Sequence, residues 1–171
     1  MSDQVTPFLR QLSLEMSETC GLYVQVGDSV EVVASAISTQ ALSYTMKVGM
    51  NAPLYAVSAG KIVLSELPSE ELGRYLDRVT FAPVTPHTVR SKGRLKKEIQ
   101  KIKATGFAYS REEFTLGITA IATAVRTELK FYGAINLAVP TARFTPSREA
   151  DFREALRRAA QAIAKEISRE L

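Results

Sequence analysis

The sequence predicts an α+β fold in which helices flank a largely antiparallel sheet. Two pairs of strand-like runs are each joined by a short link, which is typical of antiparallel hairpins. Helical patterns lie between the pairs and at both ends, without the strict βα alternation of a parallel sheet. The chain has 171 residues, of which 46% are hydrophobic and 23% charged. This length and hydrophobic content suffice for one domain with a substantial core.

A helix is expected at the N-terminus, because Thr6 offers a capping hydroxyl and Pro7 suits the first helical position. Four apolar residues then recur at helical spacing, namely Phe8, Leu9, Leu12 and Met16. Gly21 is expected to end the helix. We therefore divide the chain into a linker helix over residues 1–20 and a domain over residues 21–171.

The first hairpin is predicted from Leu22–Val26 and Val30–Ile37, two β-rich runs on either side of Gly27-Asp28-Ser29. A third strand is expected over Ala41–Val48. The Gly, Asn and Pro within residues 49–53 then indicate a loop.

Helices are predicted in the middle of the chain. One is expected from Ser58 and a second, shorter one from Ser69. Phe81–Val89 contains two prolines and predicts a loop. Ser91–Thr105 predicts an amphipathic helix, which Gly106 ends.

The amphipathic helix lies in a basic segment, since seven Lys and Arg residues fall within residues 90–103. Such a segment is typical either of a nucleic-acid surface or of a solvated helix face. Leu95, Ile99 and Ile102 form an apolar stripe opposite the charges, and no aromatic residue interleaves the basic ones. We therefore favour the solvated face.

The second hairpin is predicted from Ile118–Val125 and Phe131–Val139, after a loop rich in Ser and Glu. Strand side chains alternate between faces. One face is mostly small and has one amide: Ala120, Ala122, Ala124, Tyr132, Ala134, Asn136 and Ala138. The other is large and apolar: Ile121, Val125, Ile135, Leu137 and Val139. A small face either lets a helix approach closely or leaves room for a ligand.

The last helix is expected to begin at Thr145-Pro146-Ser147 and to run to the C-terminus. Its buried stripe consists of residues at helical spacing: Phe152, Leu156, Ala160, Ile163 and Ile167.

The composition argues against several classes of protein. The net charge of +4 is modest, and no apolar run has the length of a membrane span or resembles a signal peptide. Cys20 and His87 are the only residues of their kinds, so no internal disulfide and no transition-metal site is expected. We expect a cytoplasmic protein without a metal ion or other cofactor.

Ser58 and Lys61 form an S-x-x-K sequence, the first motif of serine acyl-transferases of the penicillin-binding type. The companion motifs S-D-N and K-T-G are absent downstream. Ser58 also opens a predicted helix, where its hydroxyl either caps the helix or, with the first amides, binds an anion.

Glu112 and Glu113 are adjacent carboxylates, but neighbouring side chains point in different directions and a second catalytic group is missing. We expect Glu113 to support the loop that carries Ser110. Together these features favour binding of a small molecule over its turnover.

Three stretches resemble the IclR-type bacterial transcription regulators, the isocitrate-lyase regulator family. The first contains Gly106, Ser110, Glu113, Ala120-Ile121-Ala122 and Val125. The second is Gly49–Lys61, and the third is Arg143-Phe144-Thr145 before the last helix. The chain departs from the signature at Arg126 and Thr127, where an aromatic residue or His and an acidic or amide residue are usual.

The resemblance implies a GAF-like antiparallel sheet flanked by helices, and an effector-binding domain for a small metabolite, often an organic or aromatic acid. It implies a homodimer or homotetramer. Operator DNA would be bound only through an N-terminal winged helix-turn-helix, which is absent from this chain.

The resemblance also implies a set of ligand-contacting positions: Ala41, Tyr44, Ser58, Ala59, Ser110, Ala120, Asn136 and Ala138. Ser110 stands where Asp is common and Ala120 where Cys is common, while Asn136 and Ala138 replace the Ser of glyoxylate-type members. Such a pocket would be larger and less polar, and would suit an aromatic or longer acid. The alternatives are a small hydrolase that uses Ser58 and Lys61, and a ligand-free dimerisation module.

Overall fold

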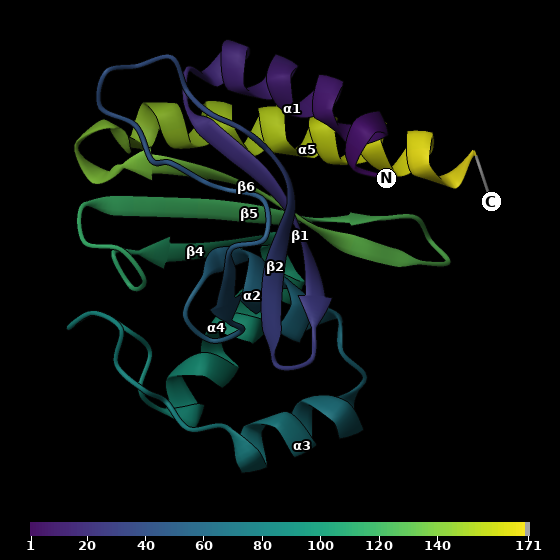
Figure 1. Cartoon of the computed structure of the whole chain (residues 1–171). Coiled ribbons are helices and arrows are strands. Elements are labelled where there is room, and N and C mark those ends of the chain that lie inside the picture. Colours follow the sequence, from purple (N-terminus) through teal and green to yellow (C-terminus); the bar gives the residue numbers. More distant parts are fainter. Residues whose placement is uncertain (170–171) are drawn as a thin grey trace.

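The computed structural model describes residues 1–169 and contains a single six-stranded sheet (Figure 1). The elements in chain order are α1 (Ser2–Met16), β1 (Thr19–Val26), β2 (Ser29–Ala36), β3 (Asn51–Pro53), α2 (Ser58–Glu66), α3 (Ser69–Arg78), α4 (Lys92–Thr105), β4 (Phe107–Arg111), β5 (Ile118–Arg126), β6 (Phe131–Pro140), the 3₁₀ turn η1 (Thr141–Arg143) and α5 (Pro146–Ser168).

The sheet is antiparallel throughout, with the strand order β3-β2-β1-β6-β5-β4. Helices α1 and α5 lie side by side on one face, and α2 and α4 cover the other (Figure 1). Helix α3 lies beyond α2 and α4, farther from the sheet. The α+β fold with a largely antiparallel sheet and flanking helices is therefore confirmed.

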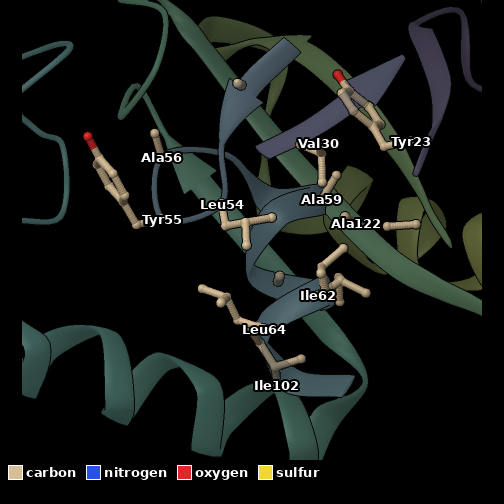
Figure 2. Packing of buried hydrophobic residues seen from close by; sticks show 14 of the residues in the cluster. Tyr23, Val30, Leu54, Tyr55, Ala56, Ala59, Ile62, Leu64, Ile102 and Ala122 are labelled. Carbon is tan, nitrogen blue, oxygen red and sulfur yellow. The ribbon is translucent and has the colours of Figure 1, made fainter. Parts of the chain in front are cut away.

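The two faces of the β5–β6 hairpin enter different cores, as their alternation predicts. Ile121, Ile135 and Leu137 pack against α1 and α5. On the opposite face, Ala122 packs beneath Ala59 of α2 (Figure 2). Helix α2 comes close because its neighbours on the sheet are small. This half of the small face is therefore plain core.

Several helix ends follow the predicted signals. The Ser91 hydroxyl accepts a hydrogen bond from the Arg94 amide and caps α4, which ends at Gly106 with φ of 84°. The Thr145 hydroxyl accepts one from the Arg148 amide and caps α5. The basic residues of α4 lie mostly on its exposed side, opposite the buried stripe.

The prediction of a third strand over Ala41–Val48 is wrong. These residues form a loop, and β3 occupies residues 51–53, where a loop was expected. Backbone bonds with Val32 hold the end of this segment at Gly49 and Met50, and side chains hold its middle. The hydroxyls of Ser35 and Thr19 donate to the carbonyls of Met46 and Tyr44. We call residues 37–50 the Tyr44 loop.

The predicted ends of the first helix are also wrong. Helix α1 begins at Ser2, one turn earlier than expected, and Val5 in this added turn is buried. It ends at Met16, and Gly21 lies inside β1, where a Cβ atom would collide with the Met46 side chain. Residues 19 and 20 thus belong to the sheet.

The segment Phe107–Arg111 forms the edge strand β4, whereas a loop was expected before the second hairpin. Ser110 is consequently held in register with the sheet. Within residues 1–169, no helix combines the length and apolarity needed to cross a membrane.

Candidate ligand-binding site

The unfilled half of the small face lies beyond the N-terminus of α2. One row of paired residues crosses four strands here: Ser110 of β4, Ala120 of β5, Ala138 of β6 and Thr19 of β1. Directly paired residues point to the same face of a sheet. The row therefore forms a floor of small side chains that α2 does not cover.

A cavity of about 30 Å³ lies on this floor. Its walls are formed by Tyr23, Tyr44, Val57, Ser58, Ser110, Phe114, Thr115, Ile118, Ala120, Asn136 and Ala138. Six of the eight predicted positions are among them: Tyr44, Ser58, Ser110, Ala120, Asn136 and Ala138. A cavity of this size holds about two water molecules. A metabolite can enter only if part of the wall moves.

Ser58 is the first residue of α2, and its hydroxyl does not cap the helix. Val57 occupies the cap position and makes no side-chain cap. The Ser58 side chain is buried, yet its Oγ atom has no hydrogen-bond partner among the described residues. The first amides of a helix lack intrahelical acceptors. The α2 start thus presents donors to the cavity.

Asn136 places a second polar group in the cavity. Its Nδ2 atom lies 3.5 Å from the Tyr23 hydroxyl, while its buried Oδ1 atom has no partner among the described residues. Burial raises the pKa of Tyr23, as does nearby Tyr44, and the Asn136 hydrogen bond only partly opposes this. Tyr23 thus stays neutral and serves as a hydrogen-bonding group.

Two predicted positions do not line the cavity. Ala41 is exposed in the Tyr44 loop. Ala59 is fully buried in the core, because one helical step from Ser58 turns its side chain towards the sheet (Figure 2). Only its backbone amide belongs to the α2 start.

Five residues of the cavity wall were not predicted from the sequence: Tyr23, Val57, Phe114, Thr115 and Ile118. Phe114 and Thr115 lie in the turn between β4 and β5, which Glu112 opens with φ of 56°. The Glu112 carboxylate closes that turn by accepting from the Gly117 amide at 2.6 Å. Only the alternation of β1 could have indicated Tyr23.

Glu113 supports the segment that carries Ser110. Its Oε2 atom accepts from the Arg111 amide at 2.7 Å, and its Oε1 atom lies 2.9 Å from Lys61 Nζ. Lys61 also donates to the Tyr109 carbonyl and pairs with Glu98 at 3.0 Å. These bonds join α2, α4 and β4 beside the cavity.

The arrangement does not support a hydrolase that uses Ser58 and Lys61. The Lys61 ammonium is engaged by Glu113, Glu98 and the Tyr109 carbonyl, and makes no bond to Ser58. A nucleophilic serine requires a base within hydrogen-bond reach. Residues 1–169 also contain no group of three or more His, Cys, Asp or Glu suited to a metal ion.

The family model for the C-terminal region of the bacterial transcriptional regulator IclR matches residues 1–165. The chain belongs to the IclR family. The match begins before the sheet, so it includes α1. The recognition from the three sequence stretches is confirmed, and the chain is an effector-binding domain of this family.

Relatives of the IclR-family domain include the HTH-type transcriptional regulator Rv1719 of Mycobacterium tuberculosis, with 37% identity over 90% of this chain and 58% of that protein. The repressor AllR of Klebsiella pneumoniae is 28% identical over 92% of this chain and also 58% of that protein. The chain thus spans somewhat more than half the length of these relatives. The relatives are named as regulators and repressors, which are not enzymes.

Solved structures of the same fold include IclR of Thermotoga maritima, with a TM-score of 0.89 and 25% identity over 96% of this chain and 67% of that one. The PobR inducer-binding domain from Acinetobacter, a double mutant in complex with 3-hydroxybenzoic acid, has a TM-score of 0.87 and 25% identity over 96% of this chain and 97% of that one.

Proposed function

We propose that this IclR-family domain binds an organic acid, with aromatic acids preferred, and thereby modulates DNA binding by a winged helix-turn-helix domain elsewhere in the protein. One observation carries the proposal. Ser58 Oγ and Asn136 Oδ1, two buried polar atoms that find no partner within residues 1–169, belong to residues that line the same cavity. An orphaned buried polar atom costs about 1–3 kcal/mol, which a bound ligand would recover.

The pose follows from the chemistry of the wall. The ligand carboxylate would lie at the α2 start, where the Ser58 hydroxyl and the first amides donate to it. The body of the ligand would rest on Ala120 and Ala138, against Phe114. A hydroxyl at the far end would donate to Asn136 Oδ1. The 3-hydroxybenzoic acid bound by the related PobR domain supports this choice of class.

Calorimetry with four acids tests the proposal: benzoate, 3-hydroxybenzoate, glyoxylate and pyruvate. We expect the aromatic acids to bind most tightly, and 3-hydroxybenzoate to bind more tightly than benzoate because of Asn136. Ser58→Ala should weaken binding at least about tenfold, the equivalent of 1.4 kcal/mol. Ser65→Ala, on the same helix but outside the cavity, is the matched control. Tighter binding of the keto acids would contradict the preference, and no binding by any acid would contradict the function.

We further propose that the domain works in the cytoplasm as a homodimer or homotetramer, and that it catalyses no reaction. Light scattering after size exclusion should give a mass that is a multiple of the protomer. Activated esters should leave Ser58 unmodified, because the side chain of Lys61 is engaged elsewhere. A burst of acylation at Ser58 would contradict the absence of catalysis.

A further inference from the structure

Glu18 stands at the junction between α1 and β1 and is completely buried. A buried carboxylate is tolerated only when it is paired. Arg143 makes a bidentate contact with it, at 2.7 Å from Nε and 2.8 Å from Nη2, and Arg148 Nη1 lies 2.9 Å away. We call Glu18, Arg143 and Arg148 the junction cluster.

Each arginine of the junction cluster also reaches a backbone carbonyl. Arg148 Nη2 donates to the Met16 carbonyl in the last turn of α1 at 2.6 Å. Arg143 Nη2 donates to the Leu42 carbonyl in the Tyr44 loop at 2.7 Å. The same carboxylate therefore joins the end of α1, the start of α5 and the Tyr44 loop.

Thr19 makes a second connection to the same loop. Its hydroxyl donates to the Tyr44 carbonyl at 2.7 Å and accepts from the Ser38 amide at 3.0 Å. The Ser38 hydroxyl donates to the Ser17 carbonyl at 2.9 Å. Residues 17–19 thus hold the loop on both sides of Leu42.

The Tyr44 loop is also a wall of the cavity, through the Tyr44 side chain. The loop has no strand or helix of its own, and neither has the β4–β5 turn that carries Phe114 and Thr115, whereas the floor and the α2 start belong to regular elements. A cavity of about 30 Å³ must expand to admit a ring-sized molecule. The β4–β5 turn is closed by the Glu112 and Gly117 amides, whereas the part of the loop around Tyr44 is held by side-chain bonds from Thr19 and Arg143. We therefore take the Tyr44 loop as the part of the wall that moves at least cost.

We infer that the junction cluster and Thr19 position the Tyr44 wall of the cavity and couple it to α1, so that filling the cavity loosens the docking of α1 on the sheet. The inference rests on the proposed function only for the nature of the natural ligand. The coupling concerns two parts of this chain, and it can be measured without any ligand. Coupling between sites is a free energy, and it is reciprocal.

Cys20 supplies the readout. It is the only cysteine, it is buried, and its thiol donates to the Leu9 carbonyl of α1 at 3.1 Å. Helix α1 packs on this thiol, so lifting α1 exposes it to a thiol reagent such as DTNB. The labelling rate at constant pH therefore reports the docking of α1.

Substitution Ala120→Met fills the cavity from its floor, and the smaller Ala120→Val repeats the test if the Met variant folds poorly. We expect cavity filling to raise the labelling rate of Cys20 at least about fivefold, within the usual range of coupling between sites. In an Arg143→Lys background the same substitution should change the rate less than about twofold. Lysine keeps the charge beside Glu18 but lacks the fork that also reaches Leu42.

The comparison of Ala120→Met, Arg143→Lys and the double variant forms a double-mutant cycle. It separates positioning of the Tyr44 loop by Arg143 from a general loss of stability. Asp28→Asn, which breaks the exposed Asp28–Arg78 pair at the opposite end of the molecule, is the control background. There the effect of Ala120→Met should persist in full. The inference is overturned if Ala120→Met leaves the labelling rate of Cys20 unchanged. It is also overturned if Ala120→Met changes that rate equally with Arg143 and with Arg143→Lys. Failure of every acid to bind would instead overturn the proposed function and leave this cycle intact.

Discussion

Lys61 Nζ lies 2.9 Å from Glu113 Oε1, and both side chains are almost completely buried. This pair connects α2, which starts at Ser58, to the turn that follows Ser110 on β4. The lysine of the S-x-x-K sequence therefore has a structural role. It holds the two sides of the cavity together and is not a base for the serine.

Breaking this pair should be costly. We expect Glu113→Gln to lower the free energy of unfolding by about 3–5 kcal/mol, because the Lys61 charge is left buried with less compensation. Urea unfolding followed by circular dichroism measures the change. The exposed Glu66–Arg126 pair is the control, and Glu66→Gln should cost less than about 1 kcal/mol. Equal losses in the two variants would contradict a structural role for Lys61.

Asn136→Leu should separate stability from binding. Removing the orphaned Oδ1 atom should leave the free energy of unfolding unchanged or raise it by about 1 kcal/mol, since the amide makes only one long hydrogen bond. The same variant should lose the preference for 3-hydroxybenzoate over benzoate. Thermal melting with and without each acid measures both effects. A large loss of stability would show that Asn136 is needed by the fold itself.

Gly60 and Gly73 both lie in helices and should respond oppositely to alanine. At Gly60 a Cβ atom would overlap the backbone of Leu54, so Gly60→Ala should destabilise by roughly 2 kcal/mol or more. At Gly73 no atom lies within 4 Å of such a Cβ, and Gly73→Ala should stabilise by about 0.5–1 kcal/mol. Chemical denaturation of the two variants gives the comparison. A neutral Gly60→Ala would mean that α2 can move away from Leu54.

Stability should fall above about pH 9 partly because of Cys20. Burial raises its pKa from the ordinary value of 9.0 to about 12, so the unfolded chain loses this proton at a lower pH than the folded chain. The contribution is complete below pH 9.0 and is lost as the pH rises towards 12. Cys20→Ala should unfold with a shallower pH dependence, by up to about 1.4 kcal/mol per pH unit in that window.

Unfolding in urea at several pH values from 8 upwards, under reducing conditions, gives the slopes. Burial also raises the pKa of Tyr23 and of Tyr75, so part of the alkaline loss should persist in the Cys20→Ala variant. Identical slopes for the two proteins would show that the thiol titrates normally in the folded state.

The sequence by itself determined the elements whose signals are local. Strand-like runs joined by short links predicted both hairpins, and the cap residues Ser91 and Thr145 mark helices that begin where expected. Local patterns also separated the small face of the β5–β6 hairpin from the large one. The three stretches similar to the IclR family led to six of the eleven residues that form the cavity wall.

Only the tertiary structure decided how that small face is used. Helix α2 covers Ala122 but ends short of Ala120, so one face serves both as core and as cavity floor. The partners of Lys61, and the lack of a partner for the Ser58 hydroxyl in the part of the chain that the structure describes, depend on residues distant in the chain. Residues 41–48 of the Tyr44 loop were wrongly predicted as a strand because their apolar residues suit β-structure. Side-chain bonds from Ser35 and Thr19 hold the middle of this segment, and no local pattern predicts bonds between such distant residues.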